Sequence, residues 1–484
     1  MPSLPVEATS AEPVAPVAGG TRERVWAWGR STSVTSWVYR PSTIDGVRTV
    51  LDVARRGGMT VGLRGGGRSY GDAALNADQV SLDLSRMNRV LDWDPASGII
   101  RVEPGVTIAQ LWQYAIEDGW WPPVVPGTMF TTLGGCAAMN VHGKNNWKMG
   151  PLGDHVLAFD LLLPDGEIRR CTPEDDAGLF TAAIGGFGLL GCFTSLSVQL
   201  KRVHSGLLEV EPVGAQTIDE MLEAIASRMD SADYLVGWVD TLARGPHLGR
   251  GLVHAARYLH AGEDAEPGST LRADRQGLPE LILGFFPKAA VWRAMRLLTN
   301  DAGVRLVNAA HYRIARLQRR RYRQSHAAFA FLLDYVPDWQ RAYGPGGLIQ
   351  YQSFIPAASA SAVFRDQLRL AQARGVVPYL GVLKRHRADR FLMTHAVDGY
   401  SLALDFRVTS RNRAALWALA AELDGLVTAA GGRFYLAKDS TLTRASYVRA
   451  LGEDRLRRFL ELKRACDPED LLQTDAYRRL IAPR

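Results

Sequence analysis

Cysteine is scarce in this sequence, and closely spaced cysteines are missing. Four cysteines are spread over 484 residues without a CxxC pair. A disulfide-rich secreted scaffold or a cysteine-ligated zinc site needs such spacing, so neither is expected. We predict reduced thiols in the core of a cytoplasmic protein, and no metal site.

Long apolar runs are missing as well. No stretch approaches the roughly 20 uninterrupted apolar residues that a transmembrane helix needs. The opening MPSLPVEATSAEPVAPVAGG is rich in Pro, Ala and Val but lacks the continuous apolar core of a signal peptide. We therefore predict a flexible tail over residues 1–22, no secretion, and no membrane contact beyond a peripheral one.

The excess of positive charge is small, since 57 basic and 50 acidic residues give a net charge of +7. This balance suits an anionic ligand or a lipid surface, but it is too small to indicate a nucleic-acid-binding protein. The densest basic run is RLQRRRYR, residues 316–323. Two interpretations stay open for this run, a solvated helix face and a phosphate-binding patch.

Local patterns in the first 200 residues predict an α+β fold. Ser42 and Asp45 have the spacing of a capping box before a helix that Gly57 ends, and the strand TVGLR follows. A second helix is expected at TIAQLWQYAIEDG, residues 107–119. A hairpin is expected at HVLAFDLLLPDGEIRRC, residues 155–171, with its turn at PDG.

Three glycine-rich loops stand out: GLRGGGRSYGD (62–72), PGTMFTTLGGCAAMNVHGKNN (126–146) and GGFGLLG (185–191). Glycine allows positive φ angles, and it also lets a backbone approach a ligand closely. Successive bare amides form nests that bind anions. Three such loops in one half of the chain favour a bound anionic ligand over purely structural turns.

The third loop contains GFGLLG, which matches the dinucleotide fingerprint GxGxxG. That fingerprint needs a strand before it and a helix after it. Here the order is reversed, because DDAGLFTAAI before the loop predicts a helix and CFTSLSVQL after it predicts a strand. A Rossmann-type NAD site is therefore not expected.

From about residue 205 the segments become longer and more amphipathic, which indicates a second domain. In IQYQ, residues 349–352, Gln350 and Gln352 alternate with Tyr351, so a strand would point both amides to the same face. The segment TAAGGRFYLAKDS begins a strand-like return near residue 428. A charged helix is then expected to end before the Asp-Pro pair at 467–468.

Taken together, RGGGRSYGD, PGT with TTLGG, NVHGKN, GGFGLLG and FYLAKDS resemble the flavin-dependent oxidases of the vanillyl-alcohol oxidase type. The resemblance runs from about Trp26 to the C-terminus and is weakest between about 205 and 330. It implies an α+β fold with a two-part FAD-binding domain, residues 23–204 and 429–484. An inserted α+β substrate domain, residues 205–428, would lie over the flavin.

The resemblance implies FAD as the cofactor. Many members attach FAD covalently through a histidine after the glycines, where this chain has Arg68, so noncovalent FAD is expected. The residues that the resemblance assigns to the cofactor are Arg64, Gly65, Gly66, Gly67, Arg68, Ser69, Tyr70, Pro126, Gly127, Thr128, Gly134, Gly135, His142, Gly143, Gly188 and Tyr435.

The resemblance also implies catalytic roles for Lys438, His142 and Tyr70. A cation near the flavin stabilises the negative charge of its reduced ring, and an imidazole can assist proton movement or bond a loop carbonyl instead. The family branch of greatest resemblance has Asn and Cys at the positions of Ser401 and Ala403. The residues assigned to the substrate are Gln350, Gln352, Lys384, Ser401, Ala403 and Lys438.

The activity that this resemblance implies is FAD-dependent oxidation of a secondary hydroxyl on a polyprenyl-phosphoryl pentose. A short-chain reductase would be the partner, and the basic run near Arg320 would face a membrane. The departures keep a second hypothesis open, oxidation of a soluble sugar, alditol, nucleoside or 2-hydroxy acid. A third is a flavin-binding component without turnover, against which the retained His142 and Lys438 speak.

Overall fold

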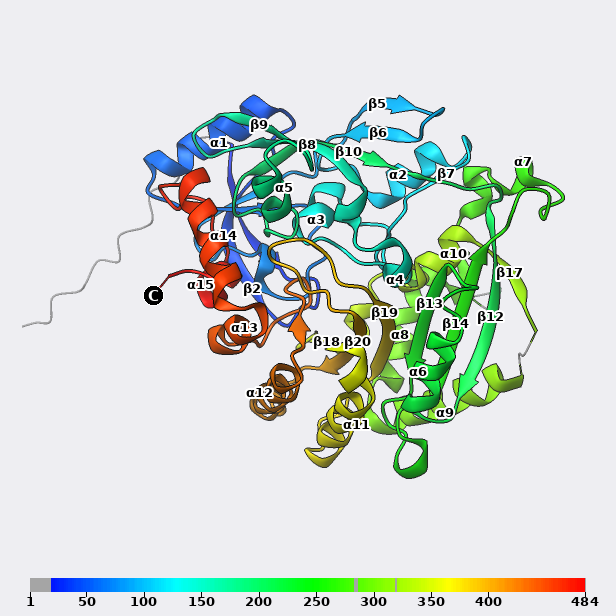
Figure 1. Ribbon diagram of the computed structural model, residues 1–484. Coiled ribbons are helices and arrows are strands. Elements are labelled where there is room, and N and C mark those ends of the chain that lie inside the picture. The colour runs from blue at the N-terminus through cyan, green and yellow to red at the C-terminus, as the bar shows by residue number, and fades with distance from the viewer. Residues whose placement is uncertain (1–18, 283–285, 318–319, 484) are drawn as a thin grey trace, which may run out of the picture.

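The computed structural model describes residues 19–282, 286–317 and 320–483 (Figure 1). Most of the expected tail, residues 1–18, lies outside this range. Strand β1 already begins at Thr21, because it pairs with β2, so the expected boundary at 22 is two residues late. Within the described residues, no helix is both long and apolar enough to cross a membrane.

The described residues of the first 200 positions form two main sheets. One has the order β1-β2-β4-β3, in which β2, β4 and β3 run parallel. The other is antiparallel with the order β5-β6-β10-β8-β9. The strands are β1 (Thr21–Trp26), β2 (Ser33–Tyr39), β3 (Val61–Arg64), β4 (Val80–Asp83), β5 (Val90–Asp94), β6 (Ile99–Val102), β8 (Val156–Leu162), β9 (Ile168–Cys171) and β10 (Cys192–Gln199).

The N-cap of helix α1 (Ile44–Arg56) lies one residue later than expected. The Thr43 hydroxyl, not that of Ser42, accepts the N–H of Gly46, so the predicted Ser42–Asp45 capping box is wrong. Gly57 does follow the last residue of the helix, as predicted. Both Ser42 and Thr43 are good caps, so the sequence alone does not distinguish these two positions.

Other local predictions in this half are confirmed. Helix α2 (Ile108–Ala115) lies within the expected segment 107–119, and β8 and β9 form the expected hairpin. A capping box between Thr107 and Gln110, which was not predicted, starts α2. Helix α5 (Ala177–Ala183) precedes the third glycine loop and β10 follows it, so the order is indeed the reverse of a Rossmann unit. The remaining elements are α3 (Leu133–Ala138), α4 (Asn146–Met149) and the pair β7 (Trp120–Trp121) with β11 (Lys201–Arg202).

Among the described residues, an eight-stranded sheet has the order β17-β12-β14-β13-β19-β20-β18-β21. The last of these strands comes from the C-terminal return and pairs with β18. The strands are β12 (Leu207–Ala215), β13 (Tyr234–Val239), β14 (Gly251–Tyr258), β17 (Tyr322–Ser325), β18 (Leu348–Pro356), β19 (Leu380–His386), β20 (Gly399–Arg407) and β21 (Arg433–Phe434).

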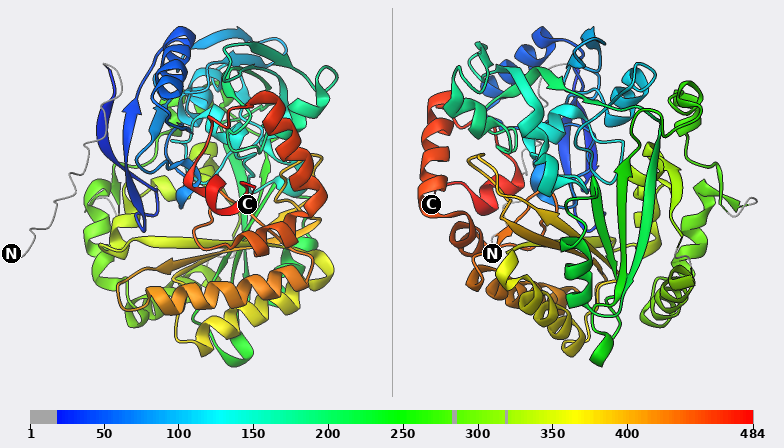
Figure 2. Two further views of the ribbon diagram at one scale, coloured as in Figure 1. Left: turned by 90° about the vertical axis from the view of Figure 1, so that its left-hand side faces the viewer. Right: turned by 45° about the vertical axis from the view of Figure 1, so that its right-hand side comes forward.

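The two faces of this sheet have different neighbours (Figure 2). Helices α6 (Ile218–Ala226), α11 (Ala357–Ala373) and α12 (Arg413–Ala429) cover one face. On β13, Gly237 faces Met221 of α6, whereas the next residue, Trp238, contacts His311 of α9 on the opposite face. The remaining elements are α7 (Pro267–Thr270), β15 (Leu281–Ile282), β16 (Phe286–Pro287), α8 (Lys288–Leu298), α9 (Asp301–Leu317), α10 (His326–Ala330), α13 (Arg444–Leu451), α14 (Glu453–Cys466) and α15 (Asp475–Leu480).

The basic run at 316–323 is not one solvated helix face. Helix α9 ends at Leu317, residues 318–319 lie outside the described range, and β17 begins at Tyr322. Arg321 pairs with Glu209 and Glu211 of the neighbouring strand β12. Because the Arg321 guanidinium is already paired with these two carboxylates, the structure does not support a phosphate-binding role for Arg321 either.

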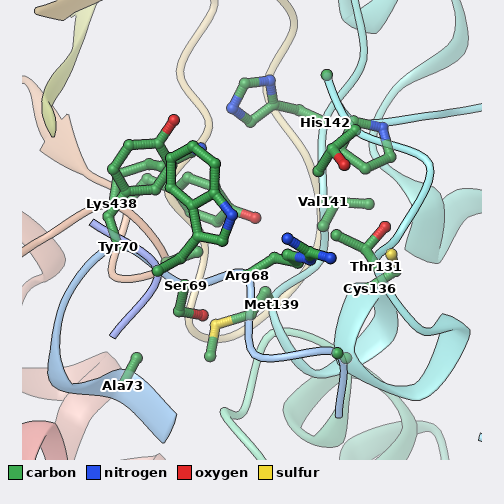
Figure 3. Close-up of a pocket in the computed structure, with 18 of the residues that line it drawn as sticks. Arg68, Ser69, Tyr70, Ala73, Thr131, Cys136, Met139, Val141, His142 and Lys438 are labelled. Atoms are coloured by element: carbon green, nitrogen blue, oxygen red, sulfur yellow. The ribbon is translucent and has the colours of Figure 1, made fainter. Parts of the chain in front are cut away.

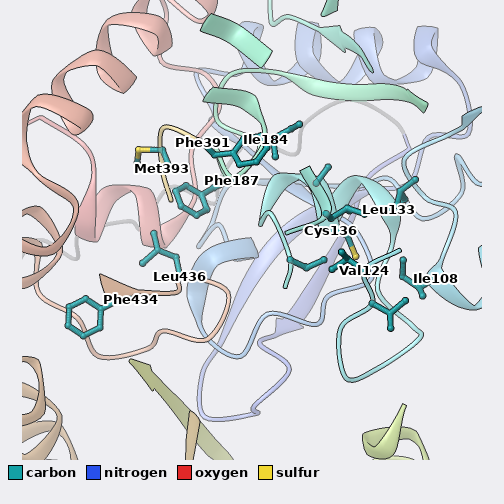
Figure 4. Packing of buried hydrophobic residues seen from close by; sticks show 14 of the residues in the cluster. Ile108, Val124, Leu133, Cys136, Ile184, Phe187, Phe391, Met393, Phe434 and Leu436 are labelled. Atoms are coloured by element: carbon teal, nitrogen blue, oxygen red, sulfur yellow. The ribbon is translucent and has the colours of Figure 1, made fainter. Parts of the chain in front are cut away.

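A large apolar core joins segments that are far apart in the sequence (Figure 4). Ile184, just before the third glycine loop, and Phe187 within it lie in the same cluster as Phe391 and Leu436. The four cysteines are buried and free, as predicted, and burial raises the pKa of Cys136 to about 12. The glycine loops are therefore fixed by a shared core.

Candidate functional site

A cavity of about 530 Å³ lies between the glycine loops and the eight-stranded sheet. We call its two sides the glycine wall and the sheet wall. Figure 3 shows part of the lining, with Arg68 and Tyr70 on one loop and His142 on another. The glycine wall includes residues 63–70, 126–128, 131–132, 134–136 and 187–188, and the sheet wall includes Val236, Trp238, His254, Gln350, Gln352, Leu380, Val382, Lys384 and Ala403.

The first glycine loop follows β3 and packs too closely for side chains. A Cβ on Gly65 would overlap the Thr132 hydroxyl, and one on Gly66 would lie 2.5 Å from the Phe130 carbonyl oxygen. Gly67 has φ of +63°, a conformation that L side chains rarely adopt. Glycine is therefore required at these positions by packing and conformation together.

The glycine wall fits an anionic dinucleotide cofactor. Within the described residues, the backbone amides of Gly67, Arg68 and Ser69 have no hydrogen-bond partner, although all three residues line the cavity. The Nε of Arg68 and the Oγ1 of Thr131 are buried there without a partner as well. Unpaired buried donors are rare in folded proteins and indicate a polar ligand, here one with negative charge.

Lys438 lies at the other end of the glycine wall, after the short strand β21. Its Nζ is 3.9 Å from the centre of the Tyr70 ring (Figure 3). Burial lowers the pKa of Lys438, and the charge of Asp405 partly offsets this effect. Burial likewise raises the pKa of Asp405, whose Oδ1 accepts the Gln350 side-chain amide at 2.5 Å. Burial thus destabilises the charged forms of both Lys438 and Asp405.

His142 lies within a cluster of aromatic and imidazole rings. Its ring centre is 4.9 Å from His386, 5.4 Å from His395 and 5.3 Å from Tyr435. Burial, together with positively charged neighbours such as Lys384, moves the pKa of His142 well below its usual value, so the ring is neutral. Its Nε2 lies 3.2 Å from Nε2 of Gln352, which can only donate. The ring proton is therefore on Nδ1, which has no partner.

The sheet wall carries the remaining polar groups, placed by antiparallel register. Gln352 is opposite Ala403, and Lys384 is opposite Ser401. Gln350 and Gln352 both line the cavity, as their alternation predicted, whereas Tyr351 bonds Asp424 on the other face. Lys384 also lines the cavity, and burial lowers its pKa to about 8, so it is still mostly protonated at neutral pH.

Two of the predicted site residues do not line the cavity. Ser401 is fully buried behind the sheet wall, where its Oγ lies 3.2 Å from the Gln352 amide and 2.8 Å from His386 Nε2. Gly143 is closed in by the Asn145 side chain. The other predicted residues do line the cavity, namely Arg64, Gly65, Gly66, Gly67, Arg68, Ser69, Tyr70, Pro126, Gly127, Thr128, Gly134, Gly135, His142, Gly188, Gln350, Gln352, Lys384, Ala403, Tyr435 and Lys438.

Sequence reasoning did not assign roles to several residues at this site. Asp405 follows Ala403 by two positions, so strand alternation alone would have placed it on the same face. His386 and His395 join His142 only through the fold, and no local pattern indicates them. Trp238 and His254 also line the cavity. Among the described residues, no group of His, Cys, Asp or Glu could hold a metal ion.

The C-terminal residues support the first glycine loop. Arg479 forms a bidentate pair with Asp72, which follows the loop, and also pairs with Asp439 beside Lys438. The N–H of Val61 on β3 donates to the carbonyl of residue 471 at 2.7 Å. The end of the chain therefore holds the cofactor loop and the Lys438 segment together.

Comparisons with known proteins agree with this geometry. Residues 35–172 match the family described as FAD binding domain. The decaprenylphosphoryl-beta-D-ribose oxidase of Mycolicibacterium smegmatis is 30% identical over 95% of this chain and 98% of its own length. An uncharacterized protein of Streptomyces coelicolor is 31% identical over 78% of this chain and all of its own. Mouse L-gulonolactone oxidase is 29% identical over 40% of this chain and 43% of its own.

The match to the FAD binding domain covers the first two glycine loops, where free amides and an unpaired guanidinium nitrogen are left for an anionic ligand. The similarity to the ribose oxidase extends over nearly the whole of both chains. This chain therefore belongs to the FAD-linked oxidases of the vanillyl-alcohol oxidase type, as an FAD-dependent oxidoreductase acting on CH–OH groups.

Proposed function

We propose that this enzyme oxidises a secondary hydroxyl to a ketone on a polyprenyl-phosphoryl pentose, as the 2'-oxidase half of a ribose-to-arabinose epimerisation. The observation that carries the proposal is the similarity to the mycobacterial ribose oxidase over 95% of this chain. A match of that extent includes both the glycine wall and the sheet wall. The match to gulonolactone oxidase covers only 40% of the chain.

In this proposal, residues 23–204 and 429–484 hold FAD noncovalently and residues 205–428 bind the substrate. The free amides of Gly67, Arg68 and Ser69 would hold the pyrophosphate. Arg68 stands where a histidine would make the covalent bond to flavin. Its buried guanidinium adds a positive charge instead of a covalent link.

When bound, FAD supplies the acceptor for the hydride that leaves the carbinol carbon. Lys438 takes the hydroxyl proton, because burial lowers its pKa and favours the neutral amine before the reaction. The ammonium formed then stabilises the negative charge that accumulates beside it. Burial keeps the Tyr70 hydroxyl protonated, and neutral His142 has an N–H at Nδ1 that is free to donate to a ligand.

The sheet wall would orient the sugar phosphate. Gln350 and Gln352 offer amides toward the cavity, while Asp405 and His142 hold those amides in place. Lys384 provides the cation for the phosphate. The product is a 2-keto sugar that needs a hydride donor for its return to an alcohol, which is why a short-chain reductase is the proposed partner.

A second candidate is oxidation of a soluble sugar, alditol, nucleoside or 2-hydroxy acid. It is favoured by Ala403, which offers only a methyl group to the cavity, and by Ser401, which bonds Gln352 and does not line the cavity. Neither residue provides a polar contact for a lipid-linked substrate. The two candidates differ in whether a phosphate and an apolar tail are required.

The test begins with an absorbance spectrum before and after acid precipitation. Yellow supernatant supports noncovalent FAD, and a yellow pellet contradicts it. Anaerobic titration with farnesylphosphoryl ribose should then bleach the flavin, while ribose and ribitol at equal concentration should not. Bleaching by the free sugars alone would replace the proposal with the second candidate.

A further inference from the structure

The exposed apolar side chains of this protein are concentrated in one part of the chain. Among the described residues, fifteen large apolar side chains are exposed, and nine of them lie within residues 281–332. This segment is about a tenth of the chain. Scattered exposed apolar residues are normal, whereas a concentration of them indicates an interaction surface.

The same region carries the positive charge of the protein. Residues 288–323 contain ten Lys or Arg and one Asp, a net charge of +9, although the whole chain carries +7. The rest of the sequence is therefore slightly acidic. The single acidic residue, Asp301, accepts a hydrogen bond from the Tyr379 hydroxyl. Four arginines on helices α8 and α9 form no ion pair among the described residues, namely Arg293, Arg296, Arg305 and Arg313.

Apolar and basic residues are mixed on one pair of adjoining helices. Helices α8 and α9 contact each other and lie at an outer edge of the molecule beside the eight-stranded sheet (Figure 2). Leu297 is 79% exposed, Leu306 67% and Ile314 58%. We define the α8–α9 surface by these exposed side chains: Arg293, Arg296, Leu297, Leu298, Arg305, Leu306, Val307, Arg313 and Ile314.

The α8–α9 surface adjoins an opening of the cavity. His311 of α9 and Leu332 both line the cavity, and both are exposed. Val307 and Ile314 lie four residues before and three residues after His311, so they share its side of the helix. A continuous row of side chains thus leads from the cavity to the exposed apolar surface.

We propose that the α8–α9 surface docks on an anionic lipid bilayer and places the cavity opening at the membrane. Leucines and an isoleucine among unpaired arginines are typical of a helix that lies in the bilayer interface. Two other partners fit this surface less well. Nucleic acid would bind the arginines but leave the exposed leucines without contacts. A second copy of this chain would bring two positively charged surfaces together. The inference extends the proposed function, which rests on a lipid-linked substrate, by naming the membrane-facing surface.

The test is sedimentation of the intact flavoprotein with vesicles, without substrate. Vesicles of equal parts phosphatidylcholine and phosphatidylglycerol should bind the protein, and vesicles of phosphatidylcholine alone should bind it much more weakly. Each arginine near an anionic surface is worth roughly a fivefold change in affinity. The variant R296Q/R305Q/R313Q should therefore bind about 100-fold more weakly, and added salt should weaken the wild type.

Two matched controls separate the surface from general effects. R369Q/R449Q/R458Q removes the same charge from helices α11, α13 and α14 and should bind like the wild type. L297S/L306S/I314S should lose binding, whereas L157S/I168S, at exposed positions outside the surface, should keep it. Flavin content and thermal midpoint confirm that each variant is folded.

The proposal is overturned if anionic vesicles do not bind the protein, or if surface and control variants bind equally. Two further results would overturn the proposal if the protein does not bind vesicles. One is loss of self-association in L297S/L306S/I314S, and the other is loss of RNA binding in R296Q/R305Q/R313Q. Because no turnover is measured, failure to bind vesicles is distinct from failure to oxidise a lipid-linked sugar.

Discussion

The two walls of the cavity recognise their ligands in different ways. The glycine wall presents backbone amides and close packing, with Gly65 and Gly66 pressed against residues 130–132. The sheet wall presents side chains in pairs, Gln350 with Asp405 and Gln352 with His142. Recognition through backbone amides suits a cofactor that many enzymes share, because it depends little on side chains. Recognition through side chains suits a substrate that is specific to one enzyme.

This difference explains what the comparisons establish. A glycine loop that binds a pyrophosphate through its backbone amides tolerates little change in sequence. The match to an FAD binding domain therefore identifies the cofactor. The sheet wall can exchange single side chains without changing its backbone, as at Ala403. Family membership therefore fixes the chemistry more firmly than it fixes the substrate. The predictions below test the roles of the two walls.

The largest effect is expected where the two walls meet, at Lys438. The substitution Lys438→Ala removes the proposed proton acceptor and should slow anaerobic flavin reduction by about 10²–10⁴-fold. FAD content should be unchanged, because the amide nest is intact. Lys148→Ala, which breaks a surface pair with Asp233, is the control and should react normally. A rate for Lys438→Ala close to that of the control would exclude the catalytic role.

The next effect concerns charge on the sheet wall. With a pKa of about 8, Lys384 is a cation at neutral pH and loses its charge as the pH rises further. KM for a phosphorylated substrate should therefore rise above pH 8. Lys384→Met should raise KM by about 10–100-fold at pH 7, as expected for loss of a charge-assisted hydrogen bond, and leave it insensitive to pH. The measurement is KM against pH, and a variant profile that still rises above pH 8 would contradict the assignment.

A smaller effect is expected on the glycine wall. Gly66→Ala brings a Cβ to 2.5 Å from a backbone carbonyl that cannot move freely, so it should cost about 1–3 kcal/mol and reduce FAD occupancy. Gly178→Ala in α5 has open space around its Cβ and should be neutral or slightly stabilising. Thermal midpoint and flavin absorbance per chain measure both. Full flavin content in Gly66→Ala would show that the loop tolerates a side chain.

The smallest effect is expected behind the sheet wall. Ser401→Ala removes the hydrogen-bond partner of both Gln352 and His386, and should raise KM by about 2–10-fold with little change in kcat. Ser353→Ala is the matched control, since Ser353 is equally buried but bonds Gln367 instead. If both variants behave alike, Ser401 has no positioning role.

Local patterns predicted the elements better than the contacts between them. Three correct predictions depend on neighbours in sequence: the helix α2, the reversed order around GFGLLG, and the shared face of Gln350 and Gln352. The cap of α1 was missed by one residue, because Ser42 and Thr43 have the same capping chemistry. The sequence therefore offers two equivalent caps at adjacent positions.

The contacts at the site depend on strand register, which no local pattern gives. His142 meets His386 and His395 only because β19 and the segment after it pass beside the second glycine loop. Ser401 was expected at the substrate, and strand alternation does put it on the correct face. The larger Gln352 side chain donates a hydrogen bond to Ser401 and lies between it and the cavity. The short Ser401 side chain therefore does not reach the cavity.

The contacts of Arg479 and residue 471 with the first glycine loop have a consequence for biosynthesis. Strand β3 lies at the edge of its sheet, and the segment that closes this edge is synthesised about 400 residues after it. A nascent chain that has already made its glycine loops still lacks the clasp from Arg479 to Asp72 and Asp439. The supported form of the glycine loop therefore requires residue 479 to have been synthesised. A cut near residue 470 would act on the flavin site although it lies about 400 residues away in sequence.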